Sequence, residues 1–303
     1  MTVFMCSGQG AQKPGMGADL LALPEVAATF ELASDVMGID LARLACEGSA
    51  EEVNDAYNAQ ALTMAVSVGV GNALFARGLE PRAVVGFSLG QISALALAGA
   101  LDEKAAFGLL RVRATAMARA AAETQGAMAA LLGATVPDAE ALCAECSEGQ
   151  VLVAANHNCP GQVVISGEVS AVDRAQEAWA SAGKRAARLN TAGAFHSPLM
   201  QSAADELAAY CVNVEFRQPR IPLVCNTDAR PFLVQQAAER LAAQVVSPVL
   251  FEESVLYLAS QGCTRFVEAG FGGVLTGLVR RIDKTLQREK AGTLPELEAL
   301  FTN

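Results

Sequence analysis

The chain has 303 residues, of which 52% are hydrophobic and 18% charged, so it can bury a full core and should be globular. Its 22 basic and 32 acidic residues give a net charge of −10, which argues against nucleic acid or an anionic membrane as a general partner. The cysteines are scattered and the first residues lack the basic segment of a secretory signal, so we expect free thiols and a cytoplasmic protein. Cys143 and Cys146 have no second cysteine pair or nearby histidine at zinc spacing, and we predict no metal site.

The N-terminal third alternates strand and helix patterns. A strand is predicted at residues 3–6, followed by a polar loop, Ser7-Gly8-Gln9-Gly10-Ala11-Gln12, that can bring backbone amides close to a ligand. An ordinary glycine turn would have the same composition. Helical periodicity follows at residues 25–37 and 50–77, before a second strand at 83–85. This alternation predicts a parallel sheet with both faces covered.

The second strand ends at Gly86-Phe87-Ser88-Leu89-Gly90, which fits the G-x-S-x-G pattern of a nucleophile elbow. Small flanking residues permit the strained turn that projects a serine hydroxyl, and the following helix start can aim N–H groups at an oxyanion. Taken alone, the pentapeptide fits an ordinary strand–helix turn equally well. Residues 83–101 are uncharged over the length of a membrane span, but the glycine-rich turn and Gln91 favour a strand followed by a buried helix.

A different pattern occupies residues 126–190. It contains a strand, a helix, two strands, a helix and a strand, at 126–133, 137–147, 151–156, 161–167, 170–183 and 184–190. This β-α-β-β-α-β order is the ferredoxin-like split unit, with residues 156–162 as its hairpin loop. We therefore predict an α/β fold with a large domain, residues 1–123 and 191–303, and a small inserted domain, residues 124–190.

The large domain is predicted to continue after the insertion with two more helices and two strands. We expect a helix to Cys211, a strand at residues 223–226, a helix to Val246 and a strand at residues 265–267.

A serine nucleophile needs a base at neutral pH, and the chain has two histidines, His157 and His196. His196 lies immediately before an amphipathic helix at the return to the large domain, whereas His157 lies in the predicted hairpin. Their positions favour His196 but leave His157 open. The order serine then histidine fits α/β-hydrolases, but no Asp or Glu between them stands out at a strand end as the acid of a triad.

Five segments together resemble the malonyl-CoA:acyl carrier protein transacylases and the related polyketide-synthase acyltransferase domains. They lie at residues 8–12, 86–90, 156–162, 194–200 and 274–278, so the resemblance covers nearly the whole chain. It implies a large α/β-hydrolase-like domain with a ferredoxin-like insertion and an acyl site in the cleft between them. It also implies that no cofactor is needed, because the substrates are malonyl-CoA and a phosphopantetheinylated carrier protein.

The resemblance assigns the chemistry to particular positions. Ser88 would be the acylated nucleophile and His196 its general base, while the backbone N–H groups of Gln9 and Leu89 would line the oxyanion site. The main-chain carbonyl of Gln244 would orient the histidine in place of a triad acid.

Further positions are assigned to the substrate. Arg113 falls where the family has an arginine that pairs with the free carboxylate of the malonyl group. Arg111 lies two positions away and would face elsewhere on a helix. Gln60 and Asn158 match polar positions that line the pocket, and Phe195 before the histidine resembles the malonyl-selecting form.

The chain departs from the family at several positions near the site. Phe87 and Gln91 stand where members usually have histidine and glutamate, and we expect both polar contacts to be lost. Cys6-Ser7 replaces Phe-Pro, and Gly-Phe-Gly-Gly at residues 270–273 replaces Gly-Pro-Gly-Lys. Because nucleophile, base and arginine are retained, these changes should affect efficiency and partner choice more than chemistry.

The leading functional hypothesis is malonyl transfer to an acyl carrier protein in fatty-acid synthesis, carried out by a monomer. Related alternatives are the malonyl-transferring subunit of a malonate decarboxylase and a trans-acting polyketide acyltransferase. Alternatives of another class are a serine thioesterase or hydrolase and a non-catalytic scaffold. Carrier proteins of this kind are acidic, so Lys184, Arg185 and Arg188, or else Arg280 and Arg281, are predicted to receive the carrier.

Overall fold

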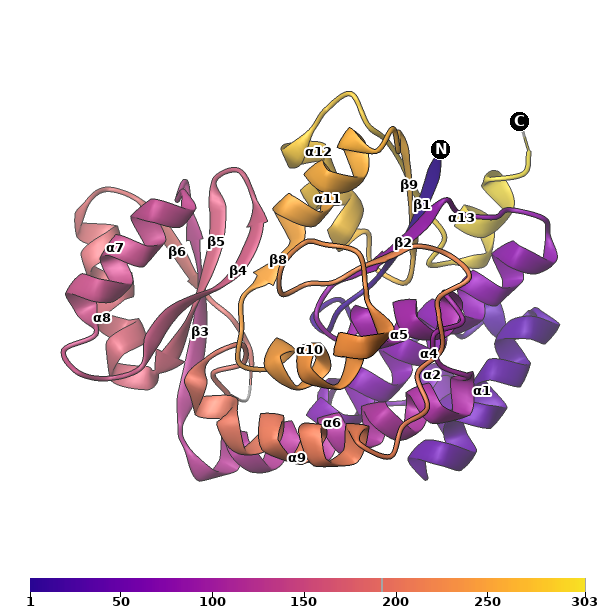
Figure 1. The fold of residues 1–303 in the computed structure, drawn as a ribbon, viewed down its shortest axis with the longest axis horizontal. Coiled ribbons are helices and arrows are strands. Elements are labelled where there is room, and N and C mark those ends of the chain that lie inside the picture. The colour runs from indigo at the N-terminus through magenta and orange to yellow at the C-terminus, as the bar shows by residue number, and fades with distance from the viewer. Residues whose placement is uncertain (192, 303) are drawn as a thin grey trace.

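The computed structural model describes residues 1–191 and 193–302 and contains two five-stranded sheets in different parts of the molecule (Figure 1). The first sheet is parallel throughout, with the order β10-β9-β1-β2-β7. Its strands are β1 (Thr2–Cys6), β2 (Ala83–Gly86), β7 (Leu223–Val224), β9 (Arg265–Ala269) and β10 (Gln287–Lys290). Because the strands are parallel, their carboxyl ends meet at one edge, where the loops after β1, β2, β7 and β9 gather.

Helices cover both faces of this sheet. In β1, Phe4 and Cys6 pack into one core cluster with α1 and α4, whereas Val3 and Met5 pack into another with α11 and α12. This alternation is what a buried parallel strand requires. The helices of this part are η1 (Asp19–Ala22), α1 (Pro24–Met37), α2 (Leu41–Glu47), α3 (Ala50–Asn54), α4 (Ala56–Ala76), α5 (Gly90–Leu97), α6 (Glu103–Glu123), η2 (Pro198–Met200), α9 (Gln201–Cys211), η3 (Val234–Gln236), α10 (Ala237–Gln244), α11 (Phe251–Ser260), α12 (Val274–Ile282) and α13 (Leu294–Ala299).

Helix α4 is the only helix in the described ranges that is long and apolar enough to cross a membrane. Its most apolar window is 83% buried inside the fold, where it packs against α1, α5 and α6. A helix that is hydrophobic all round and enclosed by others is a core helix. The uncharged stretch at residues 83–101 is instead β2, the turn with Ser88, and α5.

The second sheet has the order β6-β3-β5-β4-β8 and lies beside the first part, at the left of Figure 1. It is built from β3 (Gly126–Leu132), α7 (Val136–Cys146), β4 (Leu152–Cys159), β5 (Gln162–Glu168), α8 (Val169–Ser181) and β6 (Arg185–Arg188). The predicted order β-α-β-β-α-β and the α/β fold are therefore confirmed. The fifth strand, β8 (Val249–Leu250), comes from outside the predicted range 124–190 and pairs in parallel with β4.

Several predicted boundaries were wrong. Residues 156–162 are not a loop, because β4 continues to Cys159 and the turn has only two residues before β5. Bulges interrupt β4 between Ala154 and Asn156 and between His157 and Cys159, and these hide the strand periodicity in the sequence. Strand β10 was missed because it is a polar edge strand.

The helix predicted at residues 50–77 is two helices. Asp55 separates them by accepting the N–H groups of Tyr57 and Asn58 as the cap of α4. The predicted strand at 223–226 is shorter, ending at Val224, and the helix predicted to reach Val246 ends at Gln244.

The turn between β2 and α5 has room only for glycine at two positions. A Cβ atom on Gly86 would lie 2.0 Å from the backbone of Gly90, and one on Gly90 would lie 2.1 Å from the carbonyl oxygen of Cys6. These neighbours are backbone atoms, which cannot move aside as a flexible side chain can. The two glycines therefore let α5 start directly against the ends of β1 and β2.

We expect Gly90→Ala to lower the free energy of unfolding by about 3 kcal/mol or more. This is the upper end of the range for overpacked cores, because the added Cβ would meet backbone atoms. The matched control is Gly277→Ala in α12, where an added Cβ meets nothing within 4 Å. That variant should be neutral or gain up to about 1 kcal/mol from helix propensity. Urea denaturation of both variants measures the difference, and equal midpoints would show that the contact with Cys6 does not constrain the turn.

Candidate active site

Ser88 lies at the turn between β2 and α5, with φ of 52° in the left-handed region. A residue other than glycine in this conformation costs about 1–3 kcal/mol and is typical of functional turns. Its backbone N–H donates to Asn226 Oδ1 at 2.7 Å, and its hydroxyl is only partly buried. The turn therefore holds the hydroxyl out from the end of β2, as the elbow pattern predicted.

His196 contacts this hydroxyl, with Nε2 2.8 Å from Ser88 Oγ. Its Nδ1 lies 2.9 Å from the carbonyl oxygen of Gln244 and 3.2 Å from that of Ser247. Carbonyl oxygens can only accept, so Nδ1 carries the ring proton and Nε2 has its lone pair directed at the Ser88 hydroxyl. This tautomer is the one that can remove a proton from serine.

Burial controls the charge of His196, whose side chain is 3% exposed. Desolvation and, to a smaller extent, the nearby Arg113 charge lower the pKa of His196 to about 4, against the opposing effect of the hydrogen bonds to Gln244 and Ser247. The imidazole is therefore neutral at pH 7 and available as a base. His157, the other histidine, bonds through Nδ1 to Glu253 Oε1 at 2.9 Å and makes no hydrogen bond to Ser88.

Arg113 on α6 places a buried positive charge beside the same hydroxyl. Its Nη2 donates to Ser88 Oγ at 3.1 Å and its Nη1 to Gln60 Oε1 at 2.6 Å. The side chain is 2% exposed, Nε has no acceptor, and no carboxylate of the described residues pairs with it. Burial lowers the pKa of Arg113 to about 10, so the guanidinium stays charged at pH 7. A buried charge without a counter-ion is unfavourable, which makes this a site for an anionic group.

The other predicted substrate residues occupy different surroundings. Gln60 on α4 is buried and holds the guanidinium of Arg113, while Arg111 turns away and donates to the carbonyl of Val36. Asn158 on β4 is buried, and its Oδ1 has no partner within the described chain. Phe195 is 9% exposed and belongs to the main core cluster.

The backbone N–H groups of Gln9 and Leu89 lie in the loop after β1 and at the cap position of α5. Neither N–H donates to an acceptor among residues 1–191 and 193–302. Leu89 N–H also lies at the positive end of the α5 dipole. Both N–H groups are therefore free donors, and their role at an oxyanion beside Ser88 stays a prediction.

The prediction that Gln91 loses its polar contacts was wrong. Its Oε1 accepts from the backbone N–H of Asn226 at 2.8 Å and from Gln244 Nε2 at 3.2 Å. An amide oxygen can accept these bonds as a carboxylate would. At Phe87, an edge-on contact with the Phe251 ring at 5.5 Å replaces polar bonding.

Sequence reasoning missed Asn226 and Ser247. Asn226 follows β7, so the signal was a polar residue at the carboxyl end of a buried strand. That signal becomes usable only once β7 is known to lie beside β2. Ser247 acts through its main-chain carbonyl, so its side-chain type carries no signal.

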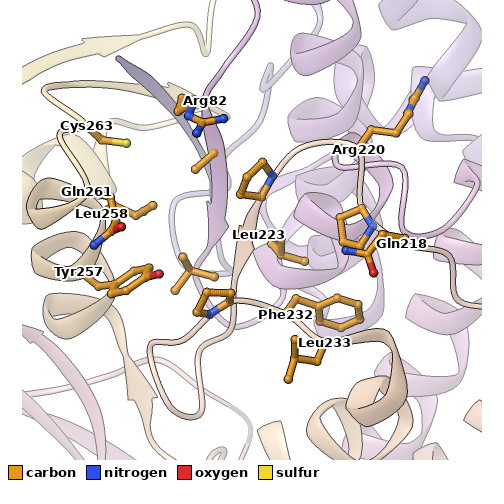
Figure 2. A pocket seen from close by; sticks show the side chains of 15 residues that line it. Arg82, Gln218, Arg220, Leu223, Phe232, Leu233, Tyr257, Leu258, Gln261 and Cys263 are labelled. Atoms are coloured by element: carbon orange, nitrogen blue, oxygen red, sulfur yellow. The ribbon is translucent and has the colours of Figure 1, made fainter.

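A cavity of about 600 Å³ lies elsewhere, at the opposite end of β2 from Ser88 (Figure 2). Arg82, Arg220 and Tyr257 are among the residues that line it, and none of the predicted site residues does. No three His, Cys, Asp or Glu side chains converge as metal ligands would anywhere in the described ranges. The predicted residues that the structure brings together are Ser88, His196 and Arg113.

The model of the acyl transferase domain family matches residues 3–298, so the chain belongs to the acyl transferase family and is an acyltransferase. Within that family it resembles the malonyl CoA-acyl carrier protein transacylases of Escherichia coli K12, at 40% identity over 93% of both chains, and of Bacillus subtilis 168, at 39% identity over 94% of this chain and 91% of the relative. These relatives share its length as well as its sequence pattern.

Solved structures agree with this assignment. A malonyl-CoA:acyl carrier protein transacylase from Xanthomonas oryzae pv. oryzae has a TM-score of 0.95 and 39% identity, covering 99% of this chain and 96% of its own. A malonyl-transacylase in complex with a type II polyketide acyl-carrier protein has a TM-score of 0.96 and 38% identity, covering 100% and 99%.

The low pKa of His196 gives a pH dependence that distinguishes it from an ordinary histidine. The base must be neutral, so its activity is present above its pKa and lost as pH falls through it. We expect kcat/KM for malonyl-CoA, which reports the free enzyme, to stay level from pH 8 to about 5. A histidine with the usual pKa of about 6.5 would lose roughly 30-fold by pH 5. An acid limb centred near pH 6.5, with the fold intact by circular dichroism, would contradict the geometry.

Proposed function

We propose a route by which Ser88, His196 and Arg113 carry out the reaction of this chain, which is the transfer of a malonyl group from CoA to an acyl carrier protein in fatty-acid synthesis. Family membership and the named relatives support the transfer. The observation that supports malonyl as the acyl group is the buried guanidinium of Arg113, 3.1 Å from Ser88 Oγ and without a carboxylate partner in the described chain.

The first half-reaction loads the enzyme. His196 Nε2 takes the proton of the Ser88 hydroxyl as Oγ bonds to the thioester carbonyl carbon of malonyl-CoA. The carbonyl oxygen becomes an oxyanion that the N–H groups of Gln9 and Leu89 stabilise. The C–S bond then breaks, the CoA sulfur takes the proton from His196, and malonyl-Ser88 remains.

The second half-reaction runs the same steps in reverse order with a different thiol. The phosphopantetheine thiol of the carrier gives its proton to His196 as its sulfur bonds to the acyl carbon. The bond between Ser88 Oγ and the acyl carbon breaks, and Oγ recovers the proton. No net charge or electron is left on the protein, so no cofactor is required.

Arg113 acts as the counter-ion of the malonyl carboxylate. Nη2 now donates to the Ser88 hydroxyl and Nε has no acceptor, so both can turn to a bidentate carboxylate when the acyl group is bound. Gln60 keeps Nη1 occupied and so fixes the plane of the guanidinium. An acetyl group has no carboxylate and leaves the buried charge unpaired.

The carrier protein is expected to bind beside the small sheet. Of the predicted basic cluster, Arg188 pairs with Asp173 at 2.7 Å, whereas Lys184 and Arg185 are exposed and form no ion pair within the described residues. The Lys184 ammonium lies over the Trp179 ring, 3.9 Å from its centroid. Lys184 and Arg185 therefore remain the candidates for acidic groups of a carrier. The chain is proposed to act as a monomer in the cytoplasm, which suits its free cysteines.

A carrier of polyketide synthesis is the alternative acceptor. The similar structure that contains a type II polyketide acyl-carrier protein favours it. Parallel assays with a fatty-acid carrier and a polyketide carrier separate the two. Because the chain is an acyltransferase, the non-catalytic scaffold is set aside. A hydrolase would release free malonate from malonyl-CoA when no carrier is present, and the same assays detect that product.

Arg113→Ala should decrease kcat/KM for malonyl transfer by about 30-fold to several thousand-fold, since removing one partner of a buried charge pair typically costs about 2–5 kcal/mol. Acetyl transfer should be equal or improved, because Ser88 and His196 are retained and an acetyl group has no carboxylate to pair with Arg113. Arg111→Ala on the same helix is the control and should change neither. Carrier acylation followed by gel shift measures both substrates. Equal losses for malonyl and acetyl would make Arg113 structural.

Charge reversal of Lys184 and Arg185 to glutamate should raise KM for the carrier several-fold at low salt, because rim charges act mainly on association. Loading by malonyl-CoA should not change, and added salt should reduce the difference from wild type. The control is Arg280→Glu, on the exposed last turn of α12. If Arg280→Glu raises KM for the carrier and the Lys184 and Arg185 variant does not, the carrier binds instead at the surface of α12 that carries Arg280.

A further inference from the structure

We infer that Asn226 is a positioning residue of the malonyl transfer: it holds Ser88 in its strained turn and joins it, through Gln91 and Gln244, to the support of His196. The inference rests on the proposed function. Asn226 follows β7 on the far side of β2 from β1, so it reaches the elbow from the neighbouring strand.

Both polar atoms of the Asn226 side chain are used on the elbow itself. Oδ1 accepts the backbone N–H of Ser88 at 2.7 Å, and Nδ2 donates to the carbonyl of Gly86 at 2.6 Å. The side chain is fully buried, so water cannot replace these bonds. An amide is the side chain that supplies one acceptor and one donor at this spacing, whereas aspartate lacks the donor and leucine lacks both.

Gln244 joins the two members of the dyad. Its Nε2 lies 3.0 Å from the carbonyl oxygen of Ser88 and 3.1 Å from Asn226 Oδ1, while its own main-chain carbonyl accepts from His196 Nδ1 at 2.9 Å. Gln91 completes the network by accepting from the Asn226 N–H and from Gln244 Nε2. One group of buried amides therefore fixes the backbone of Ser88 and the ring of His196.

The bond to the Ser88 carbonyl also orients the oxyanion donor. The carbonyl of Ser88 and the N–H of Leu89 belong to one planar trans peptide and point in opposite directions. The carbonyl accepts from Gln244 Nε2 and from the backbone N–H of Gln91, both at 3.0 Å, and this aims the Leu89 N–H to the other side, where an oxyanion would form beside Ser88 Oγ. Removal of one oxyanion donor typically costs about 100- to 1,000-fold in rate, which bounds the effect of turning this N–H away.

The network also explains how two strained residues persist. Ser88 and His196 both have positive φ, 52° and 59°. Residues in this region remain there only where the surroundings determine their conformation by several contacts. The N–H and the carbonyl of Ser88 are both held by side-chain amides, and the N–H of His196 donates to Val245 directly after Gln244.

The test is the rate at which Ser88 reacts, measured in Asn226→Leu and Asn226→Asp. The matched control is Asn72→Leu, which removes an amide that bonds Thr29 and Glu103 on the helical side, away from the elbow. Single-turnover release of CoA from malonyl-CoA gives the loading rate, and its dependence on substrate gives the half-saturation concentration. Labelling by a fluorophosphonate gives Ser88 reactivity without malonyl-CoA.

We expect Asn226→Leu to slow loading by malonyl-CoA and labelling by the fluorophosphonate about 100-fold or more, and Asn226→Asp to slow them less. The malonyl-CoA concentration at half-saturation should stay within about threefold of wild type in both variants. Gln91→Glu keeps an oxygen that accepts from the Asn226 N–H and Gln244 Nε2, so its loading rate should stay within about threefold of wild type. Gln91→Leu removes that oxygen and should load more slowly. Intact mass should still reach one malonyl group per chain in the slow variants, because Ser88, His196 and Arg113 remain. Asn72→Leu should lower the melting temperature without slowing either reaction.

Wild-type rates in Asn226→Leu, or equal slowing in Asn72→Leu at the same loss of melting temperature, would overturn the inference. Failure of the proposed function gives a different result, since wild type would then react with the fluorophosphonate and not with malonyl-CoA. In that case the fluorophosphonate rates still decide whether Asn226 positions Ser88.

Discussion

The guanidinium of Arg113 is a buried positive charge whose partners in the described chain are neutral, and the site is arranged around it. Its neighbours are the amide oxygen of Gln60 and the hydroxyl of Ser88, at 2.6 and 3.1 Å. Such a charge is unfavourable until an anion arrives, so the site favours an acyl group that carries its own carboxylate. In the proposed route, selectivity and positioning follow from one interaction, because the carboxylate that pairs with Arg113 would also bring the thioester carbon to Ser88.

No carboxylate of the described residues accepts from Nδ1 of His196. Main-chain carbonyls of Gln244 and Ser247 select the tautomer of His196 without adding a negative charge. Since the charge of Arg113 lowers the pKa of His196, the proposed binding of a malonyl carboxylate to Arg113 would weaken that effect and make His196 a stronger base.

Local patterns predicted the parts of this structure that local physics determines. The glycines around Ser88 and the alternation of strands and helices over residues 126–190 could be recognised because sterics and periodicity act over a few residues. Asn226 could not, because its bond to Ser88 spans 138 positions and depends on the strand order β1-β2-β7. The bulged end of β4 and the polar strand β10 lack the periodicity that marks a strand. The contacts of Gln91 were misjudged since its partners come from α10 and the end of β7.

The most direct test of acyl selection by Arg113 is the intact mass of the enzyme after mixing with equal concentrations of malonyl-CoA and acetyl-CoA, followed by peptide mapping. The expected result is one malonyl group, and little acetyl, on the peptide that contains Ser88. The malonyl group should be lost when a phosphopantetheinylated carrier is added, and Ser88→Ala should not be acylated. Acetyl as the main product, or a malonyl group on another residue, would contradict the claim that the buried charge of Arg113 selects the acyl group for Ser88.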